Sequence, residues 1–171
     1  LLSSEQIRDP GPFQATLSAI AGGRSKHGDI CSATGLPANS QSYVLKSLIE
    51  LGWVRKERPF GERGDSRALY VIADPFVSFH YRFVARNASA TRFTEPTRVF
   101  QQLVEPRLAD YMGRYVFESV CAQWMERHGA TAMGVMPLDM GRWWNRDGSV
   151  EVDLVASLSD RTMVFGECKW G

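Results

Sequence analysis

The sequence predicts an α+β protein with two modules: a helical module that ends in a β-hairpin, then a long helix followed by antiparallel strands. Three observations predict this organisation. Apolar residues recur at helical spacing up to residue 51, two alternating segments flank a polar, glycine-containing loop at 59–66, and strand patterns dominate after residue 129. Among the 171 residues, a hydrophobic share of 44% and a charged share of 23% are typical of a folded globular chain.

The first module, over residues 1–73, is predicted to be a winged helix-turn-helix. A first helix ends at Gly22, Asp29 can cap a short second helix, and Asn39 or Ser40 can cap a longer third helix that ends at Leu51. The second and third helices with their tight turn form the helix-turn-helix unit. The alternating segments 53–58 and 68–72 are then the strands of the wing.

A connecting segment is predicted over residues 74–97. Asp74 is placed to cap a helix that has Pro75 at its first position, and residues 87–97 are rich in small and polar side chains, which is typical of a linker. The second module, 98–171, then contains a helix at 106–129 and strands at 142–145, 150–158 and 162–170. Of the adjacent Trp143 and Trp144, one is expected in the core.

The last two strands bring acidic residues together. A three-residue loop at 159–161 pairs residue 158 with residue 162, so the numbers of paired residues sum to 320. In this register Asp153 faces Glu167, and Glu151 faces Lys169. Two facing carboxylates repel each other unless a cation lies between them, which predicts a hard divalent ion such as Mg²⁺ or Mn²⁺. Lys169 can then orient water or neutralise a phosphate. The alternative is an ordinary exposed strand in which Glu151 and Lys169 form a salt bridge.

The segments Glu151-Val152-Asp153 and Gly166-Glu167-Cys168-Lys169-Trp170 resemble the Asp and Glu-x-Lys motif of the restriction-endonuclease-like PD-(D/E)XK superfamily. The resemblance implies a magnesium-dependent deoxyribonuclease in which Asp153 and Glu167 bind the metal and Lys169 is catalytic. Glu118 matches the acidic residue that an earlier helix supplies in that superfamily, so the resemblance implies that it assists catalysis together with Lys169. Val152 replaces the usual proline, and the chain stops at Gly171, so we expect an incomplete restriction-endonuclease-like α/β domain.

A second resemblance covers nearly the whole chain. Tyr43-Val44-Leu45-Lys46-Ser47-Leu48, Asp74-Pro75-Phe76, Tyr81-Arg82-Phe83-Val84 and Gly141-Arg142-Trp143-Trp144 are similar to the C-terminal half of a prokaryotic, archaeal-type family of AAA/P-loop ATPases. That half is catalogued as a domain of unknown function. The P-loop pattern Gly-x-x-x-x-Gly-Lys-Ser/Thr does not occur here, so ATP would bind only in a preceding domain. The lack of an initiator Met also suggests a chain cut from a longer protein.

DNA is the predicted partner, although a net charge of +1 does not by itself indicate nucleic acid. Candidate contacts on the third helix and the wing are Asn39, Ser40, Gln41, Lys46, Arg55, Lys56, Arg63 and Arg67. Two hypotheses follow. One is a winged helix that delivers DNA to a nuclease-like domain, and the alternative is a catalytically inactive DNA- or protein-binding regulatory arm of a signalling ATPase, docked on a protein partner or its own ATPase domain.

The cysteines and histidines indicate a reducing compartment. Cys31, Cys121 and Cys168 are far apart and odd in number, which argues against a disulfide framework and favours the cytoplasm. The three histidines show no zinc-ligand spacing with them. No apolar run approaches the roughly 20 residues of a membrane span, so no membrane partner is expected, and the sequence does not indicate an oligomeric state.

Overall fold

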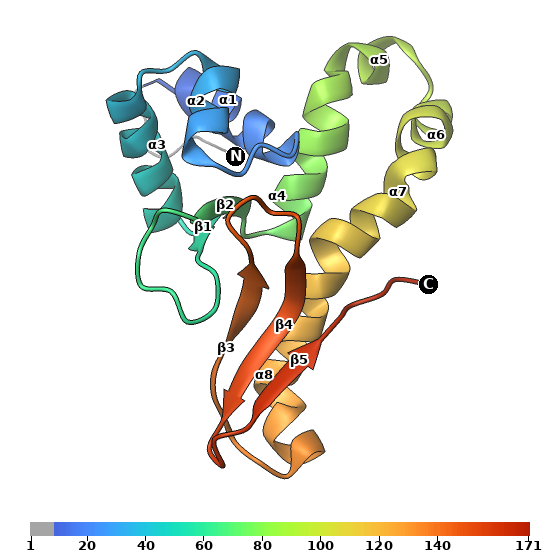
Figure 1. The fold of residues 1–171 in the computed structure, drawn as a ribbon. Coiled ribbons are helices and arrows are strands. Elements are labelled where there is room, and N and C mark those ends of the chain that lie inside the picture. The colour runs from blue at the N-terminus through green and yellow to red at the C-terminus, as the bar shows by residue number, and fades with distance from the viewer. Residues whose placement is uncertain (1–8) are drawn as a thin grey trace. The chain divides into compact units, whose positions relative to one another are not determined.

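The computed structural model describes residues 9–171 and is a mixed α+β structure with two small antiparallel sheets (Figure 1). The predicted start of the first module, residues 1–8, lies outside the described residues. The chain divides into two compact units. The first contains the chain up to Glu57 together with Ala68–Val99, and the second contains Arg58–Arg67 together with Phe100–Gly171. Within 9–171, no helix has both the length and the apolar character needed to span a bilayer.

The first unit begins with three helices and a two-stranded sheet, as the sequence predicted. These elements are α1 (Gly11–Ala21), α2 (His27–Thr34), α3 (Ala38–Glu50), β1 (Val54–Glu57) and β2 (Leu69–Ile72). The strands pair antiparallel, from Val54 opposite Ile72 to Glu57 opposite Leu69. The three helices and β1 share one core, whose largest fully buried aliphatic side chains are Leu17, Ile30, Leu45, Leu48 and Val54. The predicted order of elements is therefore confirmed.

The predicted helix caps are wrong at two places. The residue before α2 is Lys26, so Asp29 lies in the first turn of that helix. The residue before α3 is Pro37, whose extended backbone lets the helix begin at Ala38, so Asn39 and Ser40 also lie inside the first turn. Neither helix has a side-chain cap hydrogen bond at its start. Both helices therefore begin before the residues that were predicted to cap them.

The remainder of the first unit is a series of short helical segments. They are α4 (Pro75–Phe79), the π-helical η1 (His80–Val84), the 3₁₀ turn η2 (Ala85–Asn87), α5 (Ala88–Phe93) and α6 (Pro96–Val99). The segment predicted as a linker is thus helical over α5, where alanines favour the helix. The predicted cap of α4 is confirmed, because Asp74 Oδ1 accepts hydrogen bonds from the amides of Phe76 at 2.7 Å and Val77 at 3.1 Å.

Removing the Asp74 cap should measurably destabilise the first unit. We expect Asp74→Ala to lower the free energy of unfolding by about 1 kcal/mol, because two amides in the first turn of α4 lose their acceptor. Urea denaturation measures the change. Asp74→Asn keeps an oxygen acceptor and should unfold close to the wild type, so an asparagine variant as unstable as the alanine variant would contradict the capping role.

The second unit contains a long helical stretch and a three-stranded sheet. Its elements are η3 (Phe100–Val104), α7 (Glu105–Tyr111), the π-helical η4 (Met112–Phe117), α8 (Glu118–Met133), β3 (Pro137–Trp144), β4 (Glu151–Leu158) and β5 (Met163–Gly166). The antiparallel strand order is β3-β4-β5, and α8 runs along the sheet (Figure 1). The predicted hairpin register is confirmed, because Ser157 pairs with Met163 and Leu154 with Gly166. The turn contains Arg161 at φ 71°.

The loop between β1 and β2, residues 58–67, belongs to the second unit. The Phe60 amide donates to the Arg142 carbonyl at 2.7 Å. Arg67 Nη1 donates to the Trp144 carbonyl at 2.5 Å, and the Trp144 indole Nε1 donates back to the Arg67 carbonyl at 3.1 Å. Trp144 is 6% exposed and Trp143 half-buried, as expected for adjacent tryptophans on a strand. The loop is therefore hydrogen-bonded along β3.

Candidate active site and nucleic-acid interface

Asp153 lies half-buried on β4, at the level where β5 ends. Its Oδ2 accepts a hydrogen bond from the Cys168 amide at 2.7 Å. The last pair of the ladder is Leu154 with Gly166, so pairing stops one step before Asp153 and Glu167. This hydrogen bond fixes the Asp153 carboxylate against the segment that follows the sheet.

Glu167 and Lys169 lie beyond the end of β5. Their side chains are 72% and 78% exposed, and Lys169 Nζ lies 3.4 Å from Glu167 Oε1. The sequence predicted that strand alternation would continue to Lys169 and set Glu167 opposite Asp153 and Lys169 opposite Glu151. The paired strand ends at Gly166 instead, so the two residues pair with each other in the solvent.

Glu118, the first residue of α8, forms an ion pair that the sequence did not predict. Arg142 Nη2 lies 3.3 Å from Glu118 Oε2 and 3.5 Å from Glu151 Oε2. Arg142 lies on β3 where the register with β4 is irregular, between Gly141 and Trp143. The sequence could have suggested this ion pair, because Arg142 lies on the strand next to the acidic strand β4. The irregularity of the ladder that sets the position of Arg142 is not visible in the sequence.

The thiol of Cys168 is influenced by two half-buried carboxylates, Asp153 and Glu118. Burial raises the pKa of its thiol to about 12, and Cys121 together with the negative charges of Asp153 and Glu118 adds to the increase, because each disfavours a thiolate. The thiol is therefore protonated at neutral pH and is not a nucleophile. Of the two carboxylates, Asp153 contacts Cys168 directly through the backbone amide, and Glu118 acts on the thiol through its charge.

These carboxylates suit a magnesium ion that a substrate helps to bind. Magnesium takes oxygen ligands and is commonly bound by one or two carboxylates, with water and phosphate oxygens completing its shell. Asp153 and Glu118 provide such a pair. Over residues 9–171 there is no group of three or more His, Cys, Asp or Glu side chains that could hold a metal ion.

On α3, three of the predicted DNA contacts are accessible and one is not. Asn39, Ser40 and Lys46 are exposed, with Lys46 Nζ 3.9 Å from Glu50 Oε1. Gln41 is fully buried. Its Nε2 donates to Thr16 Oγ1 at 3.0 Å, and its Oε1 accepts from Thr34 Oγ1 at 2.8 Å. Gln41 therefore joins α1, α2 and α3 and cannot contact bases.

The four basic residues predicted on the wing differ in accessibility. Arg55 is exposed and its Nε lies 2.7 Å from Glu57 Oε1, while Lys56 Nζ lies 5.7 Å from the centre of the Tyr70 ring. Arg63 is exposed. Arg67 is half-buried, and its guanidinium binds Glu62 and the Trp144 carbonyl inside the second unit.

Comparisons with known proteins identify relatives without a known function. Residues 80–171, more than half of the chain, match DUF234, described as archaeal and bacterial proteins of unknown function. An uncharacterized protein of Methanocaldococcus jannaschii, MJECL04, is 30% identical over 175 residues, which cover 99% of this chain and 38% of that protein. The chain thus spans well under half the length of this relative. No solved structure matches the chain.

Proposed function

Since this chain belongs to the DUF234 family of archaeal and bacterial proteins, whose function is unknown, we propose that it is a DNA-directed part of a larger protein that hydrolyses phosphodiester bonds with magnesium. The single observation that supports this most is the Asp153 carboxylate, which the Cys168 amide holds at 2.7 Å where β5 ends. Two carboxylates and a nearby arginine and lysine are the groups that such a reaction needs.

In this proposal each residue has a separate task. Asp153 and Glu118 would hold the Mg²⁺ or Mn²⁺ ion, which would supply a water of lowered pKa and neutralise phosphate charge. Arg142 positions Glu118 through their ion pair. Lys169 and Glu167 lie in the solvent next to this place in the sequence, where Lys169 can reach a phosphate and Glu167 can add a carboxylate. Cys168, protonated, positions Asp153 through its amide.

The first unit would act as a winged helix that binds DNA. Its order of three helices and a β-hairpin supports this proposal, and Asn39, Ser40 and Lys46 on α3 are exposed to make contacts. The ATPase domain that the resemblance implies would be another part of the longer protein. The β1–β2 loop contributes Arg63 at most, because Arg67 is bound within the second unit.

The proposal is tested by magnesium binding and DNA cleavage with wild type and Asp153→Asn. We expect millimolar MgCl₂ to raise the melting temperature of the wild type and not that of the variant. Cleavage should fall by at least about 100-fold, because weakening even the groups around a metal ligand costs 10- to 100-fold. Asp139→Asn, an exposed aspartate on β3 of the same sheet, is the matched control and should behave as wild type. Undiminished cleavage by both Asp153→Asn and Lys169→Ala would refute the proposal.

A second candidate function is a non-catalytic DNA- or protein-binding arm. The observation that favours it is the pairing of the site's own charges, because Arg142 already neutralises Glu118 and Lys169 already neutralises Glu167. A site balanced in this way does not require a metal ion. The absence of any magnesium-dependent stabilisation, combined with DNA binding that survives Asp153→Asn, would select this function.

A further inference from the structure

Three exposed arginines lie in and directly beside the segment 87–97, which the sequence predicted to be a linker. Arg86, Arg92 and Arg98 are exposed and make no ion pair with any residue of 9–171. The only acidic residue between positions 80 and 99 is Glu95. Its carboxylate is already engaged, since it accepts hydrogen bonds at 3.1 Å from the amides of Thr97 and Arg98. The three guanidinium groups are therefore left to attract an anion.

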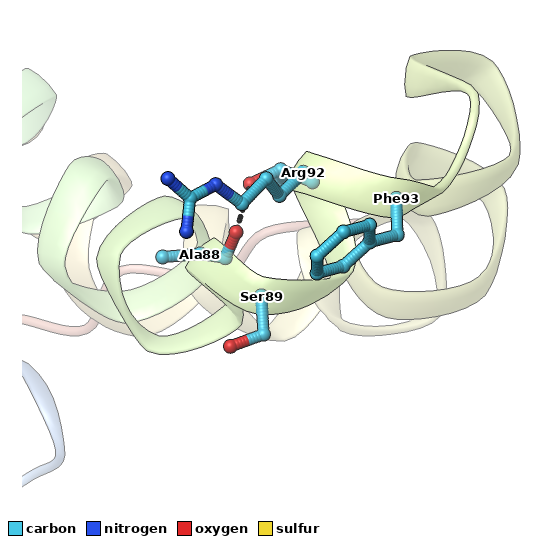
Figure 2. Close-up of a pocket in the computed structure, with 5 residues that line it drawn as sticks. Ala88, Ser89, Arg92 and Phe93 are labelled. Carbon is cyan, nitrogen blue, oxygen red and sulfur yellow. Dashed lines mark hydrogen bonds between the residues drawn. The ribbon is translucent and has the colours of Figure 1, made fainter.

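An exposed aromatic residue follows the second of these arginines in the sequence. Phe93 is 85% exposed, more than any other large hydrophobic side chain in the described part of the chain. It follows Arg92 directly on α5. Both residues line a hollow of about 350 Å³ together with Ala88, Ser89 and Thr91. Figure 2 shows the side chains of Arg92 and Phe93 on α5. An exposed ring of this size is costly in water, because burying such a side chain is worth about 1.5 to 3 kcal/mol, so a partner that covers it is favoured.

We propose that Arg86, Arg92, Phe93 and Arg98, the arginine–phenylalanine surface, bind a single-stranded nucleic acid. Guanidinium groups bind phosphates through paired, charge-assisted hydrogen bonds, and an exposed aromatic ring stacks on a base. Stacking requires a base whose face is open, which a single strand offers and a duplex does not. This surface adds a contact for unpaired DNA outside the carboxylate site. It rests on the proposed function only for the identity of the partner.

Fluorescence anisotropy with a labelled oligothymidine, at several salt concentrations, tests this surface on the whole chain. We expect Phe93→Ala to weaken binding by about 5- to 150-fold, the range of base-stacking contributions. Phe93→Trp should restore it. Replacing all three arginines by glutamine should reduce the slope of log K against log salt by about 2, because each phosphate contact on a single strand contributes about 0.7. Phe76→Ala, which removes an exposed phenylalanine from α4, and Arg24→Gln are the matched controls and should bind as wild type.

The outcomes separate this surface from the carboxylate site. Weakened binding by Phe93→Ala with a normal magnesium response supports the surface even if the chain cleaves no DNA. A wild type that fails to bind the oligothymidine at low salt, or a Phe93→Ala variant that binds as tightly as Phe76→Ala, overturns it and leaves a protein partner as the occupant. All of these side chains are exposed, so the variants should melt like wild type, and a circular-dichroism melt verifies this.

Discussion

Replacing Trp144 by alanine is expected to lower the stability of the second unit by about 3 to 5 kcal/mol, the range for buried tryptophans. The indole is 6% exposed and donates to the Arg67 carbonyl at 3.1 Å, while the Trp144 carbonyl accepts from Arg67. The alanine variant leaves a cavity and an unpaired carbonyl in the β1–β2 loop. Hydrogen exchange of amides in β3 and β4 reports the stability of this unit separately from the first.

Two variants divide this effect into its parts. Trp144→Phe keeps most of the apolar volume but loses the indole hydrogen bond, and should cost about 1 kcal/mol. Trp143→Ala removes the half-buried neighbour and should cost less than Trp144→Ala. If Trp144→Ala left exchange in β3 unchanged, the loop would not depend on this side chain.

Gln41→Ala is expected to destabilise the first unit by about 2 to 4 kcal/mol. The change removes a fully buried side chain of the size of methionine. It also leaves the Thr16 and Thr34 hydroxyls without their shared partner, and each lost buried hydrogen bond adds to the cost. Urea denaturation followed by circular dichroism measures the loss.

The neighbouring Ser40 provides the matched control for Gln41. Ser40→Ala removes an exposed hydroxyl on the same turn of α3 and should change stability by less than about 0.5 kcal/mol. A Gln41→Ala protein of normal stability that had lost DNA binding would instead restore the prediction of a base contact and contradict the structural role.

Local patterns predicted most of the secondary structure. Helical spacing located α1 and α3, the Asp74-Pro75 pair located the start of α4, and the length of the 159–161 loop fixed the register of β4 and β5. These features depend on neighbouring residues, so they are visible in a single sequence. The burial of Gln41 had a visible signal too, since positions 41, 44, 45 and 48 form one helical stripe. Because glutamine is polar, Gln41 was interpreted as a DNA contact and not as part of this buried stripe.

The candidate site was harder to predict because it depends on contacts between distant residues. Asp153 and Glu118 were identified from their motif, but the partner of Glu118 is Arg142 on another strand, at an irregularity of the ladder. Arg67 and Trp144, which are 77 positions apart, bind each other. The point where pairing ends at Gly166 decides that Glu167 is exposed, and an alternating pattern of residues does not show where a strand stops.

The position of the β1–β2 loop has a consequence for how this chain can be divided and folded. The second unit is assembled from two stretches of sequence, 58–67 and 100–171, so no single cut of the polypeptide yields it whole. A fragment that starts at Phe100 lacks the groups that bond to the Arg142 and Trp144 carbonyls. During synthesis the loop leaves the ribosome 70 residues before β3 begins, because the loop ends at Arg67 and β3 starts at Pro137. Contacts of such long range form late in folding.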